Sequence, residues 1–420
     1  MNSNRRDFLS LAGLATLSLG LPRSLRANTT PPHVLVIGGG FGGATVAKYL
    51  KLWGDNIDVT LIDRDASHYA CILSNLVVTG AIPMSRIQLG YNNLKTKRGV
   101  NIVQGEALSI DPSSREVTVK VGNDFFAYSY DKLVLSPGID FINPEGNYNS
   151  DLTPHAWKAG PQTLLLKKQL SAMTKKQTFV MTIPKSPYRC PPGPYERACA
   201  VADYLKRKKS DAKVIVLDAN PSIQAEPINF GNAFTKTYKS ILTYVPNATV
   251  NEVDSAAKTI VTTQGIFKGA VLNVIPNQRA GQIVSNAGLV NDPTGRWALV
   301  DPLNYASTLH PDIHILGDAQ GTGQPKSGHM ANSQAKVCAD AIIRSFSGEA
   351  PDPSPVTSSA CYSPITSKTA SWLTASFQYD PATKTMKRVD PSFAEAPRPT
   401  SDGMQEMFHW ADNIFADSFS

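Results

Sequence analysis

Five cysteines are the residues of this sequence best suited to redox chemistry. They lie at Cys71, Cys190, Cys199, Cys338 and Cys361. No pair has C-x-x-C spacing and no C-x-x-C-H occurs, so the sequence has no motif that attaches a c-type haem. No cluster of candidate ligands has the spacing of a metal site. Because the count is odd, at least one thiol is free, intermolecular or otherwise bonded.

A glycine-rich turn near the N-terminus predicts dinucleotide binding. A β-branched strand over 33–37 runs into GGGFGG at 38–43, and a helical stretch follows to Trp53. A second strand over 58–62 ends at Asp63, 20 positions after the third glycine of the motif. The glycine motif alone is weak evidence. Strand, G-x-G-x-x-G, helix, strand and acid in this order are typical of a Rossmann unit.

Each position of this motif has a physical role. Gly38 permits the tight turn, Gly40 lets a pyrophosphate approach the backbone, and Gly43 lets the helix pack closely on the strand. Free N–H groups at the helix start bind phosphate, and Asp63 is placed to accept from the adenosine ribose hydroxyls. The residues predicted to bind the dinucleotide here are Gly38, Gly40, Phe41, Gly42, Gly43, Asp63 and Arg64.

Two later segments indicate that the dinucleotide is FAD. A strand over 132–136 runs into a turn at Gly138, and a strand over 313–316 runs into Gly317 and Asp318. Both segments resemble the internal motifs of flavoproteins with two dinucleotide-binding folds. In that group the Asp of the second motif bonds the ribityl and phosphate region of FAD, which implies this role for Asp318; a turn or helix-capping residue is the alternative.

Two more positions follow from the same likeness. Ala107 lies where the group makes a backbone contact to adenine. The run 325–335, which contains Lys326, opens a helix whose N-terminus would face the flavin pyrimidine and stabilise the negative charge of reduced flavin.

The middle of the chain has the pattern of a second, altered Rossmann unit. We expect a strand over 178–183, a helix over 195–209 and a strand over 213–217 that ends at Asp218. The intervening loop, YRCPPGPY at 188–195, holds three prolines, which remove N–H donors where a phosphate needs them. The sequence therefore argues against a tight NAD(P) site, so electrons must come from another donor.

Residues 1–27 predict export. RRDFL at 5–9 fits a twin-arginine pattern, and an apolar run of about 13 residues follows, shorter than the roughly 20 that span a bilayer. A twin-arginine signal is a receptor-read address, used by proteins that fold around a cofactor before export. We therefore expect a periplasmic protein, with a short amphipathic helix or membrane anchor as the alternative for this segment.

The composition is that of a globular protein, with 42% hydrophobic residues. The formal charge of +7 falls to +4 without residues 1–27, which contain four Arg and one Asp. So small an excess, without a basic stripe interleaved with aromatics, argues against a nucleic-acid partner. No later segment reaches 18 uncharged apolar residues, so we expect no transmembrane segment in the mature chain.

The C-terminal part starts with a Pro/Ser-rich linker at 351–360 and ends in a predicted helix over about 402–415. A helix lying on a membrane would favour Lys and Arg on its polar face, whereas this polar face is acidic, so we expect packing on the protein itself or on a partner subunit. The apolar face holds Met404, Met407, Phe408, Ala411, Ile414 and Phe415, and the polar face Asp402, Glu406 and Asp412.

These patterns predict an α/β protein with two dinucleotide-binding, Rossmann-like domains of the glutathione-reductase type and a C-terminal interface domain. The expected ranges are a signal peptide at 1–27, a discontinuous FAD-binding domain at 33–158 and 277–350, a central NAD-like domain without an NAD loop at 159–276, and the interface domain at 351–420.

With these residues in view, the chain resembles the flavoprotein subunit of flavocytochrome c sulfide dehydrogenase over 33–420. The most specific segment is YRCPPGPYERA, and the others are VIGGGFGGATVAKYLKL, YACILSN, TPHAWKAG, HILGDA, KSGHMANSQAK and ACYSPI. The wider disulfide-reductase-like superfamily includes sulfide:quinone reductases and type II NADH dehydrogenases.

The resemblance implies roles for three cysteines. Cys71 matches the residue that bonds the flavin 8α-methyl as a thioether, so FAD is expected to be covalent. Cys190 and Cys361 match a redox disulfide beside the flavin. Buried inert thiols, or a merely structural bridge, are the alternatives. Cys199 and Cys338 match no family position, and we expect both to be buried and inert.

The implied reaction is sulfide oxidation. Hydrosulfide attacks the Cys190–Cys361 disulfide, giving a persulfide and a thiolate that reduces the flavin, and a c-type cytochrome accepts the electrons singly. Glu196 is the candidate general base, with a helix-dipole acid as the alternative. Arg189 and Arg197 either attract hydrosulfide or are solvated. Trp410 lies either between flavin and haem or in the core.

Three other functions remain open. A sulfide:quinone reductase would need an apolar quinone channel and a membrane-binding C-terminus. A type II NADH dehydrogenase is disfavoured by the proline loop. A non-catalytic FAD carrier subunit would be favoured by loss of a redox cysteine, and all three matching cysteines are present.

Overall fold

The structure is a computed structural model that describes residues 30–209 and 211–420. Residues Pro32–Ser420 form one compact unit. The predicted signal peptide at 1–27 lies outside the described residues.

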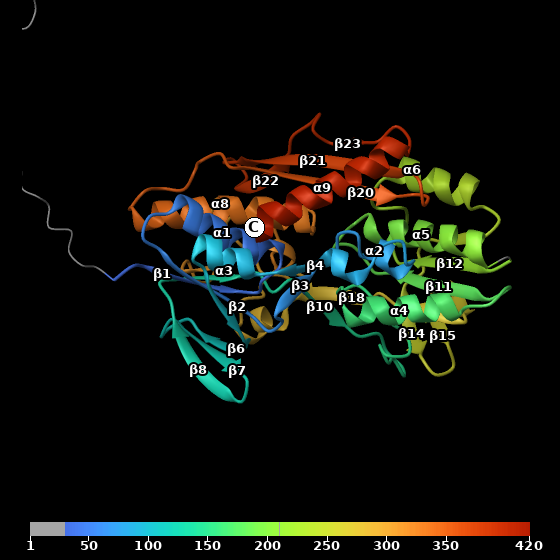
Figure 1. Ribbon diagram of the computed structural model, residues 1–420, viewed down its shortest axis with the longest axis horizontal. Helices are drawn as coiled ribbons and strands as arrows, with labels where there is room; N and C mark the ends of the chain where they lie inside the picture. The colour runs from blue at the N-terminus through green and yellow to red at the C-terminus, as the bar shows by residue number, and fades with distance from the viewer. Residues whose placement is uncertain (1–29, 210) are drawn as a thin grey trace, which may run out of the picture. The chain divides into compact units, whose positions relative to one another are not determined.

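A five-stranded parallel sheet, in the order β19-β9-β1-β2-β5, carries the glycine-rich turn. Strands β1, β2, β9 and β19 are near-continuous apolar runs such as HVLVI and are mostly buried, as expected for parallel strands covered on both faces, whereas the edge strand β5 is partly exposed. Helices α1 and α8 pack against each other beside this sheet (Figure 1). The bounds are β1 His33–Ile37, β2 Asp58–Asp63, β5 Asn101–Gln104, β9 Lys132–Leu135, β19 Ile313–Ile315, α1 Phe41–Trp53 and α8 Gly328–Phe346.

A second parallel sheet, in the order β13-β12-β11-β17, repeats this arrangement in the middle of the chain. Helix α5 follows β11, as α1 follows β1, and packs on β12. The bounds are β11 Thr178–Ile183, β12 Lys213–Asp218, β13 Leu242–Val245, β17 Val271–Asn273, α4 Pro161–Ala172, α5 Gly193–Lys208 and α6 Pro227–Asn232.

The chain passes between the two sheets at β10 (Ile139–Ile142) and β18 (Asn277–Ala280), which pair antiparallel. Smaller antiparallel elements flank the sheets: a three-stranded meander β6-β7-β8, a second meander β14-β15-β16 and the pair β3-β4. Their bounds are β3 Ser67–Tyr69, β4 Gln88–Gly90, β6 Glu106–Asp111, β7 Glu116–Val121, β8 Asp124–Ser129, β14 Val250–Asp254, β15 Thr259–Thr262 and β16 Gly265–Lys268. Short helices are α2 Ser74–Val78, α3 Asn92–Arg98 and α7 Gln282–Asn286.

The C-terminal part forms an antiparallel sheet and a last helix, drawn in orange and red in Figure 1. Strand β20 contacts α8 beside the first sheet and α5 beside the second, so it bridges the two halves. This bridging brings Cys361, in the middle of β20, towards α5. The bounds are β20 Val356–Pro364, β21 Ala370–Asp380, β22 Thr385–Arg388, β23 Ala394–Glu395 and α9 Ser401–Phe419.

The expected fold class is confirmed: a mixed α/β protein with two Rossmann-like units. Two helix boundaries differ from the sequence prediction. Helix α5 begins at Gly193 rather than at 195, since Pro194 is favourable in the first helical turn. Helix α9 continues to Phe419, because that ring packs on Phe41 and His68.

The apolar face predicted for α9 packs on the protein itself. Met407, Ala411, Ile414 and Phe415 are buried, and Met404 and Phe408 are partly buried against the same core. The acidic residues predicted for the other face are exposed.

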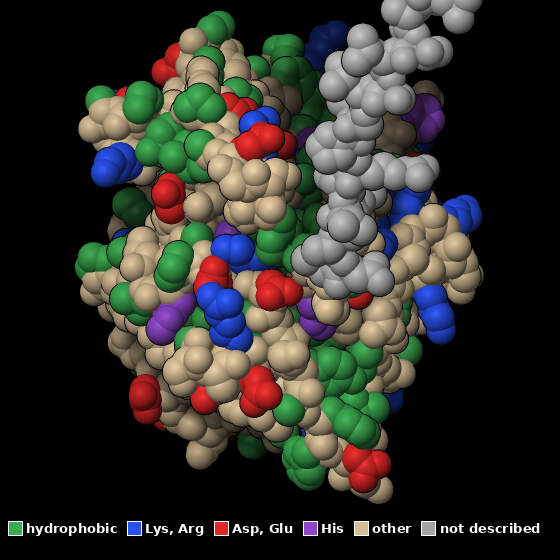
Figure 2. Space-filling model, turned by 90° about the vertical axis from the view of Figure 1, so that its left-hand side faces the viewer, with side chains coloured by type: hydrophobic (Ala, Val, Ile, Leu, Met, Phe, Trp, Pro, Cys, Tyr) green, Lys and Arg blue, Asp and Glu red, His purple; other side chains and the backbone are tan. Residues whose placement is uncertain are grey.

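On the face shown in Figure 2, Lys and Arg side chains are interspersed with Asp and Glu side chains. Within residues 30–209 and 211–420, no helix has the length and apolar character needed to cross a bilayer.

Candidate active site

A cavity of about 450 Å³ lies at the carboxyl ends of β1, β2, β9 and β19. This is the edge at which open parallel sheets bind ligands. The cavity is lined by every residue predicted to bind the cofactor except Gly43 and Lys326: Gly38, Gly40, Phe41, Gly42, Asp63, Arg64, Cys71, Ala107, Gly138, Gly317 and Asp318.

Backbone geometry explains the glycines. Gly38 has a φ of +96°, and a Cβ there would lie 2.4 Å from the Ser136 carbonyl oxygen. A Cβ on Gly43 would lie 1.8 Å from the Gly38 carbonyl oxygen, so Gly43 permits packing of α1 against the turn rather than lining the cavity. Helix α1 has no side-chain cap and no acid in its first turn, which leaves its N-terminal N–H groups for an anion.

Two carboxylates face this cavity. Asp63 accepts from the N–H groups of Gly39 and Asp65, and burial raises its pKa. The Asp318 side chain is 12% exposed, and its buried Oδ1 atom has no hydrogen-bond partner among residues 30–209 and 211–420. Burial raises the pKa of Asp318, and the positive charges of Arg189 and Lys326 act to lower it. A buried acceptor without a partner at this edge fits a dinucleotide that donates hydroxyl groups, so these residues fit FAD.

Lys326 faces away from the cavity. Its ammonium group donates to the carbonyl oxygens of Asp318 and Gln320 and lies 3.8 Å from the centre of the Trp297 ring. Burial lowers its pKa to about 8. The side chain therefore supports the turn that holds Asp318, rather than reaching the cofactor as the family likeness implied.

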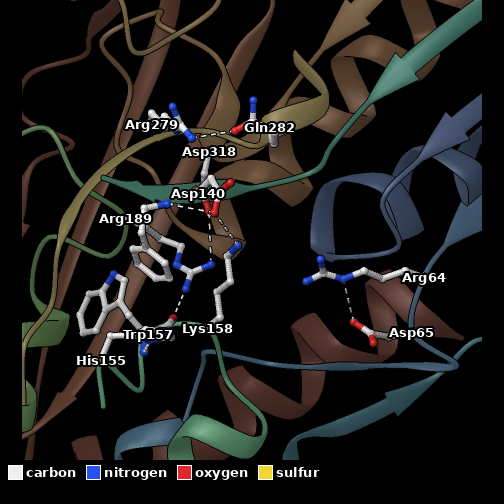
Figure 3. A network of polar contacts seen from close by, with 11 residues as sticks. Arg64, Asp65, Asp140, His155, Trp157, Lys158, Arg189, Arg279, Gln282 and Asp318 are labelled. Atoms are coloured by element: carbon white, nitrogen blue, oxygen red, sulfur yellow. Dashed lines mark hydrogen bonds and ion pairs between the residues drawn. The ribbon is translucent and has the colours of Figure 1, made fainter. Parts of the chain in front are cut away.

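A cluster of charges joins this cavity to the proline loop (Figure 3). Arg189 donates to the Trp157 carbonyl oxygen, and its guanidinium lies 3.9 Å from Asp318. Lys158 donates to Asp140 at 3.3 Å. Arg189 and Lys158 both line the cavity, so two cations face the expected position of the flavin.

Cys71 lies on the cavity wall. Its sulfur is 3.6 Å from the Trp157 carbonyl oxygen, the same atom to which Arg189 donates. The loop that carries Cys71 leads directly into α2. A sulfur in this position is available to a ligand in the cavity.

Cys190 is held in a strained loop between the cavity and α5. Its φ is +59°, a conformation that costs free energy for a residue with a side chain. Its N–H donates to the Lys326 carbonyl oxygen at 2.6 Å, which ties the proline loop to the start of α8. A Cβ on Gly193 would lie 2.7 Å from the Cys190 sulfur, so the glycine at the start of α5 makes room for that sulfur.

Arg197 is a buried structural cation, and the solvated alternative is wrong. It is 1% exposed and donates to the carbonyl oxygens of His155 and Ala156 and to the side chains of Asn75 and Asn273. Burial lowers its pKa to about 10 against the opposing charges of Glu196, Cys71 and Cys190. Nothing in the sequence pattern indicated this network.

Glu196 is 9% exposed in the first turn of α5. Burial raises its pKa to about 8, with a hydrogen bond from Asn75 and the charge of Arg197 opposing the shift. A carboxyl group with a pKa in this range exchanges protons near neutral pH. The place of Glu196 in the first turn of α5 fits the helix-dipole alternative, and its burial with a raised pKa fits the general-base candidate.

All five cysteines are free thiols in the structure. Burial raises the pKa of Cys190, and the charges of Cys361, Glu196 and Cys71 act in the same direction while Arg189 opposes them. Cys190 thus lies within range of the charges of both other cysteines matched to the family. Cys199 and Cys338 are both fully buried, as expected.

In the second Rossmann unit, the acid at the end of the second strand receives its hydrogen bonds from the unit's own residues. Asp218, at the end of β12, is fully buried and accepts from the hydroxyls of Tyr195 and Tyr244 and from the backbone and side chain of Asn220. The equivalent acid of the first unit, Asp63, faces the cavity. The arrangement supports the expectation of no tight NAD(P) site in the central part.

An aromatic cluster lies beside the Cys361 strand. The Trp410 indole donates to His329 Nδ1 at 3.3 Å, and its ring centre is 5.6 Å from that of Tyr362. His329 is the second residue of α8, directly after the cavity-lining Gly328. Trp410 is therefore partly buried against the core and also lies between the cavity side of α8 and the C-terminal sheet.

The fold and this site define a flavoprotein oxidoreductase of the disulfide-reductase-like class. A family model described as pyridine nucleotide-disulphide oxidoreductase matches residues 32–160. A second model, described as sulfide dehydrogenase (flavocytochrome c) flavoprotein chain, central, matches residues 163–276. These matches support FAD as the cofactor.

Individual relatives are similar to this chain either at low sequence identity or over a short stretch. The mitochondrial sulfide:quinone oxidoreductase of Dictyostelium discoideum is 21% identical over 80% of this chain and 76% of its own length. A type II NADH:quinone oxidoreductase of Mycobacterium tuberculosis is 31% identical, but over only 29% of this chain and 25% of its own. The structure of sulfide:quinone oxidoreductase from Aquifex aeolicus superposes with a TM-score of 0.76 at 17% identity, covering 92% of this chain and 91% of that one.

Proposed function

We propose that this protein is a periplasmic sulfide dehydrogenase that passes electrons to a c-type cytochrome. The observation that carries the proposal is the group formed by Cys190 on the proline loop, Cys361 and Glu196. The charges of Cys361 and Glu196 both act on the Cys190 sulfur, and the charge of Glu196 acts on the Cys361 sulfur. The central family model and the sulfide-oxidising relatives support sulfide as the electron donor.

FAD, when bound in the cavity, supplies a two-electron acceptor that can pass on electrons singly. The protein's own part is to hold the sulfur chemistry beside it. Hydrosulfide opens the Cys190–Cys361 disulfide by forming one S–S bond and breaking another. Glu196 accepts a proton from incoming hydrogen sulfide, and the strained backbone at Cys190 fixes the sulfur next to Arg189.

The test of this proposal is sulfide-dependent reduction of a c-type cytochrome by purified holoprotein. Cys190→Ser and Cys361→Ser are expected to abolish it, whereas Cys199→Ser and Cys338→Ser, which alter buried thiols outside the site, should retain it. Equal loss in all four variants would show that folding rather than sulfur chemistry was affected. Full activity in Cys190→Ser would overturn the proposal.

The covalent bond to FAD at Cys71 is part of the same proposal. It is supported by the position of the sulfur on the cavity wall. Denaturing electrophoresis should show flavin fluorescence that migrates with the chain and disappears in Cys71→Ser. Free flavin released from the wild-type protein would contradict the bond.

A quinone acceptor is the second candidate, because two proteins similar to this chain are sulfide:quinone oxidoreductases. Holoprotein reduced by sulfide under anaerobic conditions can be mixed with either a soluble c-type cytochrome or a short-chain ubiquinone. Rapid reoxidation by the cytochrome alone supports the proposed acceptor, and rapid reoxidation by quinone alone contradicts it. If sulfide does not reduce the protein, so that neither acceptor has electrons to take from it, the carrier alternative is favoured.

Export is proposed from the twin-arginine pattern alone. Replacing Arg5 and Arg6 by Lys should retain the protein in the cytoplasmic fraction of the expressing cell, while the unaltered chain is recovered from the periplasm. Periplasmic recovery of both would contradict the proposed route.

A further inference from the structure

The last turn of helix α9 lies beside α1, far in sequence from the glycine-rich turn (Figure 1). The Phe419 ring is 4% exposed and is stacked on the His68 ring, with ring centres 5.7 Å apart and planes inclined by 11°. The same ring meets Phe41 edge to face, with 5.6 Å between ring centres. Because His68 and Phe41 both line the cavity, one aromatic residue of the C-terminal part supports two side chains of the cavity wall.

The Phe41 ring is packed closely on two sides. Phe41 is the first residue of α1, and Gly328 is the first residue of α8. A Cβ on Gly328 would lie 2.8 Å from Cδ2 of Phe41, so the ring touches the start of α8. On its other sides the ring meets Phe415 and Phe419 of α9. The end of α9 therefore helps to set the start of α1 against the start of α8.

Polar contacts tie the same turn of α9 to α1 and α8. The Asp417 carboxylate accepts from the Tyr49 hydroxyl at 2.6 Å and from the Asn332 amide at 2.8 Å. It also pairs with Lys336 at 2.7 Å. The fully buried Ser418 hydroxyl accepts from Asn332 at 3.0 Å. Because hydrogen bonds depend on distance and angle, these contacts hold the last turn in one position.

His68 turns a polar edge towards the start of α1. A Cβ on Gly40, the N-cap residue of α1, would lie 3.5 Å from Cε1 and 3.8 Å from Nδ1 of His68. Burial lowers the pKa of His68 to about 4, and the charge of Arg189 acts in the same direction. The ring is therefore neutral at pH 7 and carries one N–H donor. This donor lies beside the helix N-terminus whose backbone N–H groups are open to an anion.

We propose that the end of α9 is part of the cofactor site: Phe419 is a positioning residue that holds the His68 ring beside the start of α1, where the ring donates a hydrogen bond to the pyrophosphate of FAD. FAD binding and docking of the last turn of α9 then stabilise each other, because coupling between two sites is reciprocal. The inference requires FAD binding but not the sulfide chemistry proposed above, so failure of sulfide turnover would leave it standing.

The first experiment measures FAD affinity. All variants carry Cys71→Ser, so that FAD is held without a covalent bond, and holoprotein is diluted serially while released FAD is followed by its fluorescence. Phe419→Ala should raise the Kd for FAD about tenfold, within the usual range of coupling between sites. His68→Phe keeps a ring against Phe419 but removes the N–H, and it should also raise the Kd about tenfold. Asp417→Ala, which removes the polar anchor and leaves the ring, should raise it about fivefold.

The matched control is Met407→Ala. It removes another buried side chain from the same helix, about three turns earlier, and should change the Kd by less than about twofold. An equal loss of affinity in Met407→Ala and Phe419→Ala would overturn the inference, because α9 would then act only through general stability. Unchanged affinity in His68→Phe would also overturn it.

Hydrogen exchange measures the same coupling from the side of α9, and it needs no substitution at position 419. In Cys71→Ser, peptides that cover 411–419 should exchange about tenfold more slowly with FAD bound than after FAD has been removed by dialysis. Peptides from the β14-β15-β16 meander of the central part report general stability and should change less. Equal exchange of the α9 peptides with and without FAD would overturn the inference.

Discussion

The two Rossmann-like units of this chain use the same local order of strand, loop, helix and strand, yet their loops serve opposite purposes. In the first unit, glycines keep the turn after β1 small, and the cavity at the strand ends stays open. In the second, prolines and tyrosines fill the equivalent position, and Asp218 is surrounded by donors from its own unit. The contrast teaches that topology alone does not specify a nucleotide site; the loop residues decide whether the end of the strand is open to a ligand or is hydrogen-bonded by side chains of its own unit.

The largest expected effect comes from closing the first loop. In Gly43→Ala the new methyl group would lie 1.8 Å from the Gly38 carbonyl oxygen, and overpacking of backbone against backbone typically costs about 1–3 kcal/mol or more. We expect purified Gly43→Ala to lose most of its FAD, as measured by the ratio of flavin to protein absorbance. Gly90→Ala, where nothing lies within 4 Å of the added Cβ, is the control and should retain FAD.

Loss of the proposed base Glu196, in the first turn of α5 after the second loop, should have the next largest effect. Glu196→Gln should slow sulfide-dependent reduction by about 10²-fold, the usual size for a general base. Because the pKa of Glu196 is raised to about 8, the wild-type rate should increase as the carboxyl group deprotonates through that pH, and the variant should lack this rise. Asp203→Asn, on the same helix, should keep the wild-type profile.

The same raised pKa makes a stability prediction with a definite sign. Folding favours the protonated form of Glu196, so its contribution to stability is present below its unfolded pKa of about 4.5 and is lost as the pH rises through about 8. Urea unfolding of the wild type should therefore show a fall in stability over this interval that Glu196→Gln reduces. An identical pH dependence in the two proteins would contradict burial of an ionising carboxyl.

Weakening the hydrogen bonds around Asp218 in the second unit should lower the stability of the protein without creating a new activity. Asp218→Asn replaces an acceptor of several hydrogen bonds by a group that also donates, so we expect a loss of about 1–3 kcal/mol in the free energy of unfolding. NADH should still fail to reduce the flavin. NADH oxidation by this variant would show that the second unit is a masked rather than a replaced nucleotide site.

The smallest effect is expected at the glycine that makes room for the Cys190 sulfur. Gly193→Ala should leave FAD content unchanged and slow the sulfide step by about tenfold, equivalent to roughly 1.4 kcal/mol of displaced geometry. Gly231→Ala in α6, which meets nothing within 4 Å, is the matched control. A loss of FAD in Gly193→Ala would mean that the two loops are less independent than their contacts indicate.

The local pattern was enough to predict the first unit, because the strand, the glycine turn, the helix and the Asp63 that ends the next strand are close together in the sequence. The loss of a phosphate site at the prolines after Cys190 stays a prediction. The surroundings of Arg197 and of the buried Glu226 were not predictable, since each depends on partners brought from distant elements: Arg197 on Asn75 and the His155 carbonyl, Glu226 on the Ser363 hydroxyl of β20.

Two further differences have the same origin. Lys326 was carried over from a family motif, but its ammonium group is satisfied by nearby carbonyl oxygens and the Trp297 ring instead of the cavity. Helix α9 is longer than the sequence pattern predicts, because the Phe419 ring packs on Phe41 and His68 of the first unit. In both cases tertiary contacts decide what the local residues leave open.

The most direct test of the central claim is an anaerobic titration of the flavin absorbance band of wild-type holoprotein with sulfide, with NADH in a parallel cuvette. The account predicts rapid bleaching by sulfide and none by NADH, because the thiol-bearing loop stands where an NAD loop would be. Bleaching by NADH and not by sulfide would contradict it.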